Sequence, residues 1–203
     1  MSRWGEVVRE VRRKSIHIIP GVMAIPVVVW GGKTVSVPIA AFFFTLYLLH
    51  EVSLRMNLKF KVPIAYHTYM MMAREEEIKG KHFRGATYFW GVTLFLVALL
   101  PPIHAAASVM VSAFGDAAAA IVGKAVGGPR LPLVPRKTLA GTTAMFLAGT
   151  ASCLAVGLPV LIALLTAMTS TIAEWLCKRS VDDELTVPVV AAVTITIAVN
   201  VLK

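Results

Sequence analysis

One stretch of the chain, residues 112–144, carries the residue types that could do chemistry on phosphates. Asp116 lies inside an apolar segment, where an ionised carboxylate costs roughly 2.5–3.5 kcal/mol on insertion scales, so it is a functional candidate. Ala120, Gly123 and Gly127 follow on the same face of the expected helix. Because these residues are small, another backbone or a ligand could approach that face closely.

The loop that comes after this helix predicts a phosphate site. Its basic residues are Lys124, Arg130, Arg136 and Lys137. Thr138 is the residue type of a helix N-cap, and cations beside a helix N-terminus suit phosphate oxygens. The stretch therefore predicts a carboxylate that could hold a metal ion, facing a loop that could hold phosphates.

The composition predicts the elements that must position these residues. The 203 residues are 57% hydrophobic and have a mean hydropathy of +0.75, which is too apolar for a soluble domain and typical of a polytopic membrane protein. We expect a single all-α domain over residues 1–203 with about seven transmembrane helices. The expected segments are Ser15–Trp30, Val35–Val52, Gly85–Leu100, Ile103–Val122, Leu139–Val156, Leu158–Cys177 and Val187–Leu202.

The placement of Lys and Arg predicts the orientation in the membrane. With the N-terminus in the cytoplasm, eighteen of the 20 basic residues fall on the cytoplasmic side, in the N-terminal arm and in loops 53–84, 123–138 and 178–179. Only Lys33 and Lys203 fall on the other side. This bias agrees with the positive-inside rule. The net charge of +9 then lies beside anionic headgroups and does not indicate nucleic-acid binding.

Further polar residues fall in the same expected cytoplasmic half. They are His17, Glu51, Glu174, Asp182 and Asp183. A single site facing the cytosol accounts for all of them, although the acids near residue 183 could instead form a helix-capping turn. The N-terminal arm is expected to be a helix that either snorkels basic side chains to the interface or directs His17 into this site. Residues 74–77 are expected to form a polar rim.

Four motifs in this order resemble the CTP-dependent lipid-alcohol kinases, a family that includes dolichol, phytol and farnesol kinases and the yeast-type diacylglycerol kinase. Residues 13–17 resemble the family's RKxxH motif, and residues 85–89 its GATYF-like helix start. Residues 115–142 resemble its GDxxAxxxGxxxG…KTxxGT core, and residues 182–188 its DDNLTVP motif. Two positions depart from the pattern: Ala140 stands where an acid is frequent, and Glu184 where Asn is usual.

The resemblance implies transfer of the γ-phosphoryl group of CTP to the hydroxyl of a polyprenol, phytol-like or diacylglycerol-like lipid at the cytoplasmic face of the cell membrane. It implies Mg²⁺ on Asp116, with Asp183 or Asp182 holding a second ion or the ribose. His17 and Glu174 remain alternative bases for the alcohol. The residues implied to bind the nucleotide are Gly123, Lys124, Gly127, Gly128, Arg136, Lys137, Thr138, Gly141, Asp182 and Asp183.

Two other functions stay open at this point. The KT-x-G piece at residues 137–141 also resembles CDP-diglyceride synthases, so a cytidylyltransferase that forms CDP-lipid is the nearest rival. A small transporter would need polar residues through both halves of the membrane, and the outer halves offer mainly Ser and Thr.

Overall fold

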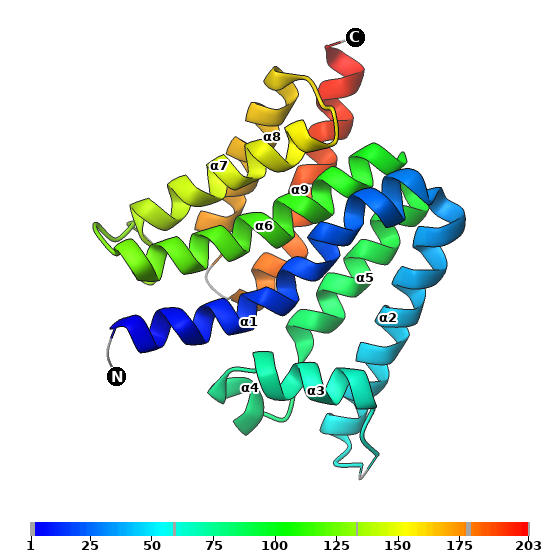
Figure 1. Cartoon of the computed structure of the whole chain (residues 1–203), viewed down its shortest axis with the longest axis vertical. Helices are drawn as coiled ribbons and strands as arrows, with labels where there is room; N and C mark the ends of the chain where they lie inside the picture. Colours follow the sequence, from blue (N-terminus) through cyan, green and yellow to red (C-terminus); the bar gives the residue numbers. More distant parts are fainter. Residues whose placement is uncertain (1–2, 59, 133, 178–179, 203) are drawn as a thin grey trace.

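The structure, a computed structural model, is all-helical, as the composition predicts (Figure 1). It describes residues 3–58, 60–132, 134–177 and 180–202, apart from the side chains of residues 3 and 180–182. Within these ranges the extended structure is limited to one bridge between Arg130 and Thr138. The helices are α1 (Arg3–Met23), η1 (Ala24–Trp30), α2 (Gly32–Arg55), α3 (Pro63–Met72), α4 (Glu75–Lys79), α5 (Arg84–Leu99), α6 (Pro102–Val126), α7 (Leu139–Ala155), α8 (Val160–Leu176) and α9 (Ser180–Val201).

Helix α6 is the central element, and its residues from Ala105 to Ala113 are all buried. It packs against α1, α7 and α9. Its approach to α7 is closest near Gly141, where an added Cβ would lie 2.7 Å from the carbonyl oxygen of Ala119 and 3.3 Å from the Cα of Gly123. The small-residue face expected along this helix therefore receives the backbone of α7.

Helices α1 and α2 pack on different partners and diverge from their common turn (Figure 1). Helix α1 continues directly into η1, a π-helical stretch that contains Pro26. Proline lacks the backbone N–H that an α-helix needs, and π-helical stretches are frequent at functional sites. Helix α1 packs along α6, whereas α2 packs along α5, and α3 contacts both α1 and α2.

Glu51 of α2 is structural in this fold. Its carboxylate accepts a hydrogen bond from the backbone N–H of Phe83, directly before α5, and pairs with Arg55 at 2.6 Å. Arg84 lies 4.0 Å from the same carboxylate. The structure therefore shows the other role that the sequence allows for Glu51, a pairing with arginines of the expected loop 53–84, and the side chain holds the start of α5.

Among the residues that the structure describes, four helical stretches are long and apolar enough to cross a membrane: Trp4–Trp30, Gly32–Arg55, Pro102–Val126 and Asp183–Val201. The three shorter apolar helices are α5, α7 and α8. Large apolar side chains are widely exposed on the outer surface, for example Trp30, Phe42 and Phe95. Contact with lipid explains that exposure, while a total of seven spans and their orientation stay predictions.

The last helix begins earlier than its sequence indicates. Helix α9 starts at Ser180, whereas the apolar pattern places its start at Val187. Thr186 and Pro188, which have the residue types of an N-cap and a first turn, lie inside the helix. Proline is tolerated inside such helices because neighbouring groups satisfy the freed carbonyl. The longer helix places Asp183 and Glu184 in its first turns, facing the other helices.

Candidate active site

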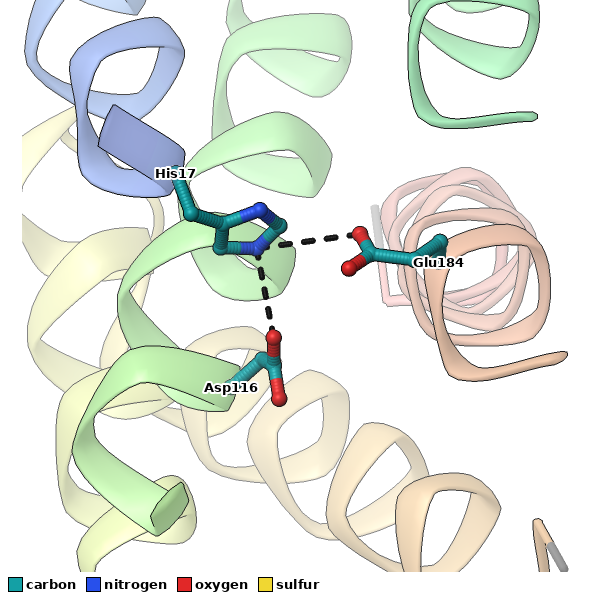
Figure 2. A group of neighbouring side chains, drawn as sticks. All are labelled: His17, Asp116 and Glu184. Carbon is teal, nitrogen blue, oxygen red and sulfur yellow. Dashed lines mark ion pairs between the residues drawn. The ribbon is translucent and has the colours of Figure 1, made fainter. Parts of the chain in front are cut away.

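Three side chains from distant parts of the chain meet at one point: His17 of α1, Asp116 of α6 and Glu184 of α9 (Figure 2). The Nε2 atom of His17 lies 3.3 Å from Oδ2 of Asp116 and 3.7 Å from Oε2 of Glu184. The ring is buried, with 7% of the residue exposed. We call these three residues the junction cluster.

Helix α1 supplies a second residue beside the junction cluster, because Lys14 lies one turn before His17. The ammonium group of Lys14 donates a hydrogen bond to Oδ2 of Asp116, and Lys14 itself is buried. Nε2 of His17 has no hydrogen-bond partner among the residues that the structure describes. The expectation that the N-terminal helix directs His17 into a polar site is therefore confirmed.

A second charged group lies at the start of α7. Nζ of Lys137 is 2.7 Å from the Glu174 carboxylate and 3.6 Å from that of Asp183, and all three side chains are more than 90% buried. The ammonium also donates to the backbone carbonyl of Glu174. The arrangement holds two carboxylates together through one cation, and we call these three residues the lysine group.

The loop before α7 is held by its own backbone. The N–H of Leu131 donates to the carbonyl of Lys137, and the N–H of Leu139 to that of Pro129, both at 2.9 Å. Thr138 caps α7 as predicted, because its Oγ1 accepts a hydrogen bond from the N–H of Gly141 at 3.2 Å. Arg136 donates to a carbonyl at the end of α8 at 3.0 Å. These backbone hydrogen bonds join the two ends of the loop, which we call the closed loop, and its end carries the basic side chains of Arg136 and Lys137.

A polar cavity of about 330 Å³ lies between these two groups. It is lined by Glu10, Arg13, Arg74, Asp116, Ala119, Ala120, Gly123, Lys124, Arg136, Lys137, Thr138, Gly141, Thr142, Glu174 and Asp183. Most of the residues predicted to bind a nucleotide are among them. The structure thus brings together the helix with Asp116, the basic loop and the last helix, as the sequence predicts.

Two of the predicted nucleotide-binding residues stand apart from the polar cavity. Gly127 and Gly128 end α6 with positive φ angles of 70° and 97°, and they do not line the polar cavity. Their conformation, which glycine adopts most readily, explains the residue type without a phosphate. The side chain of Asp182 lies outside the described residues.

A second cavity, of about 450 Å³, is lined mainly by apolar side chains. Along α1 and η1 its lining runs from Arg13 to Val28, which at 1.5 Å per residue corresponds to roughly 22 Å. The opposite walls come from α2, α3 and α5. Its charged lining residues include His17 and Glu184 of the junction cluster, so one end of this apolar cavity lies at that cluster.

Arg13 and Arg74 line both cavities and mark the place where they meet. Arg13 pairs with Glu10, which also pairs with Lys124 at 2.5 Å. Burial and then the nearby charge of Arg13 lower the pKa of the Arg74 guanidinium below its ordinary value, although a guanidinium so far above neutrality remains charged. The expectation of a polar rim at residues 74–77 missed the inward placement of Arg74.

Comparisons with known protein families, with characterised proteins and with solved structures find no significant match for this chain. The resemblance to lipid-alcohol kinases therefore rests on the four sequence motifs. The geometry of the two cavities is independent of those motifs and indicates by itself which chemical groups each cavity could hold.

Proposed function

We propose that this protein transfers the γ-phosphoryl group of a nucleoside triphosphate, with CTP indicated by the motifs, to the hydroxyl of a long-chain lipid alcohol at the cytoplasmic membrane face. One observation carries the proposal: a polar cavity with phosphate-binding chemistry and an apolar cavity with lipid-binding chemistry meet at Arg13 and Arg74. The junction cluster lies at the same place.

The polar cavity supports the donor side of the reaction. Lys137 and Arg136 supply positive charge beside the N-terminus of α7, where the backbone N–H groups also attract anions. Phosphoryl transfer depends mainly on in-line positioning and charge neutralisation. In the reaction the bond from the γ-phosphorus to the bridging oxygen breaks, a bond to the lipid oxygen forms, and the nucleoside diphosphate leaves.

The apolar cavity supports the acceptor side. Its length along α1 and η1 suits a hydrocarbon chain that lies in the membrane with its hydroxyl at the charged end. Because lipid tails are as apolar as the cavity lining, the cavity would hold the chain by van der Waals packing and would position its hydroxyl. Because the hydroxyl would then lie beside Arg13 and Arg74, the phosphoryl group has a short path between the cavities.

The two alternative bases differ in position. His17 lines the apolar cavity, whereas Glu174 lines only the polar cavity and pairs with Lys137 through Oε1. His17 is therefore the better placed of the two for the hydroxyl. It can serve either by accepting the proton or by holding a cation that lowers the pKa of the hydroxyl.

The polar cavity also fits the Mg²⁺ ion that the motifs imply. Asp116 and Asp183 both line it, and Oδ1 of Asp183 is buried without a hydrogen-bond partner among the described residues. Carboxylate oxygens are the protein ligands that Mg²⁺ prefers. When bound, the ion would neutralise the phosphate oxygens, while Lys137 and Arg136 orient them.

One observation also favours the cytidylyltransferase alternative. The two guanidinium groups where the cavities meet would suit a lipid that already carries a phosphate, because arginine binds phosphate through paired hydrogen bonds. In that reaction the lipid phosphate would attack the α-phosphorus of CTP and pyrophosphate would leave. A transporter is less well supported, since the second cavity is apolar along most of its length.

Label transfer separates these functions. The purified full chain in detergent would be incubated with Mg²⁺ and a labelled nucleotide. The lipid would be one of four alcohols (polyprenol, geranylgeraniol, phytol or diacylglycerol) in the kinase assay, and phosphatidic acid in the cytidylyltransferase assay. Organic-phase label from γ-labelled CTP supports the kinase and identifies its acceptor. Label from α-labelled CTP with phosphatidic acid alone identifies a cytidylyltransferase, and no transfer in either assay contradicts both enzymes.

A further inference from the structure

The junction cluster has the composition and geometry of a metal centre. We propose that His17, Asp116 and Glu184 bind a divalent first-row transition metal such as Mn²⁺. The inference deepens the proposed function by assigning the cation of that site and its ligands. It differs from the expected pairing of Asp116 with Asp183, and it is tested by metal binding alone, without nucleotide or lipid.

The interatomic distances fit a shared cation. Two ligand atoms that each lie about 2.1 Å from a metal are about 3.0 Å apart at adjacent octahedral positions and about 3.4 Å apart at tetrahedral positions. Nε2 of His17 lies 3.3 Å from Asp116 Oδ2 and 3.7 Å from Glu184 Oε2. One ligand atom from each of the three residues lies within 4.8 Å of the others. Modest shifts of the Asp116 and Glu184 side chains would complete the site.

The unpartnered ring nitrogen is the second observation. Nε2 of His17 is buried, points toward both carboxylates, and has no hydrogen-bond partner within the described part of the chain (Figure 2). A buried polar atom without a partner costs roughly 1–3 kcal/mol. Oε2 of Glu184 is unpartnered as well. A metal ion would satisfy both atoms at once.

The donor set indicates the class of metal. Carboxylate oxygens suit Mg²⁺ and Mn²⁺, whereas imidazole suits zinc, iron and other transition metals. One nitrogen and two oxygens therefore favour Mn²⁺ over Mg²⁺. Zinc should bind still more tightly than Mn²⁺, because Mn²⁺ stands at the weak end of the first-row affinity series, which rises to a maximum at Cu²⁺ just before Zn²⁺.

Lys14 makes the site unusual, because its ammonium occupies the same Asp116 oxygen that a metal would use. Arg13 of α1 adds a second positive charge nearby. A metal must therefore displace Lys14 from Asp116, and the ammonium acts as a competitor. Removing that competitor should strengthen metal binding, which is the opposite of what a merely structural ion pair would give.

The experiment uses the full chain in lipid nanodiscs, stripped with a chelator and titrated with Mn²⁺ while electron paramagnetic resonance reports the free ion. We expect saturable binding that His17→Gln and Asp116→Asn each weaken by at least about tenfold, a loss of roughly 1.4 kcal/mol. Lys14→Met should tighten binding several-fold. Asp183→Asn reports on the rival ligand pair and should weaken binding less than His17→Gln does. Glu75→Gln, at an exposed carboxylate, is the control and should leave the affinity unchanged within about twofold.

Pulsed electron paramagnetic resonance supplies a readout that does not depend on affinity. Bound Mn²⁺ should show coupling to an imidazole nitrogen, and the coupling should disappear in His17→Gln. Absence of saturable binding, binding without nitrogen coupling, or binding that Asp183→Asn weakens and His17→Gln does not, would overturn the inference. Label transfer supported by Mg²⁺ alone would then leave the proposed kinase function standing, so the two failures are distinguishable.

With a metal on His17, the imidazole is no longer free to accept the proton of the alcohol. When bound, the ion held by His17, Asp116 and Glu184 would supply the positive charge that lowers the pKa of the hydroxyl. Of the two roles proposed for His17, the inference therefore selects holding a cation over accepting the proton of the alcohol.

Discussion

The replacement Lys137→Met tests the charge balance of the lysine group. At an effective dielectric constant of about 20, two unit charges 2.7 Å apart attract by about 6 kcal/mol, and two charges 3.6 Å apart by about 5 kcal/mol. Desolvation cancels much of this attraction in the native protein. Removing the cation leaves two buried carboxylates with only Arg136, 4.0 Å from Asp183, as a remaining charged partner among the described residues. Breaking a buried ion pair in this way typically costs roughly 3–5 kcal/mol.

We therefore expect Lys137→Met to lower the free energy of unfolding by about 3–5 kcal/mol. Titration of the purified protein from mild detergent into sodium dodecyl sulfate, followed by circular dichroism, would measure the change. Lys79→Met is the control, because Lys79 is exposed and its replacement should change stability by less than about 0.5 kcal/mol.

A triple variant makes this test sharper. Adding Glu174→Gln and Asp183→Asn to Lys137→Met removes the buried charges together with their partner, so we expect it to recover more than half of the lost stability. If Lys137→Met unfolds at the same detergent composition as Lys79→Met, or if the triple variant recovers nothing, the argument from buried charges is refuted.

Three further predictions address packing, the apolar cavity and thiol chemistry. Gly141→Ala should lower the unfolding free energy by about 1–3 kcal/mol in the same titration, because its Cβ meets the carbonyl of Ala119; Gly85→Ala, with ordinary contacts, should change little. Ala86→Leu narrows the apolar cavity and should raise the KM for a long alcohol about tenfold, because extra methylene groups in a filled space cost roughly 1–3 kcal/mol; the KM for CTP should not change. Burial raises the pKa of the Cys177 thiol, so a smaller fraction is thiolate at about pH 8. Mass spectrometry should therefore show that Cys177 is alkylated more slowly than glutathione, and equal rates would contradict this prediction.

Local patterns in the sequence predict much of the site. Asp116 stands out because a carboxylate in an apolar segment is costly, and Thr138 because its side chain can cap a helix. Both are local properties of the chain, and the structure confirms that Thr138 caps α7 and that Asp116 lines the polar cavity. The all-helical fold is predicted in the same way from composition.

The remaining features depend on tertiary packing. Arg74 lies in a run of charged residues that resembles a solvated surface, and its placement between the cavities depends on how α3 packs against α1 and α2. The meeting of His17 with Glu184 depends on the early start of α9, which no apolar periodicity marks. Sequence alone places Gly127 at the phosphates, because chain order cannot separate a ligand-facing glycine from one that ends a helix.

The closed loop before α7 has a consequence for the entropy of ligand binding. Fixing the backbone of one residue costs roughly 1–2 kcal/mol, and a disordered phosphate-binding loop would meet that cost each time a nucleotide arrives. Here the backbone hydrogen bonds between Leu131 and Lys137, and between Leu139 and Pro129, already join the two ends of the loop in the free protein. The ordering penalty belongs to folding, so more of the attraction between Lys137 and a phosphate remains as affinity.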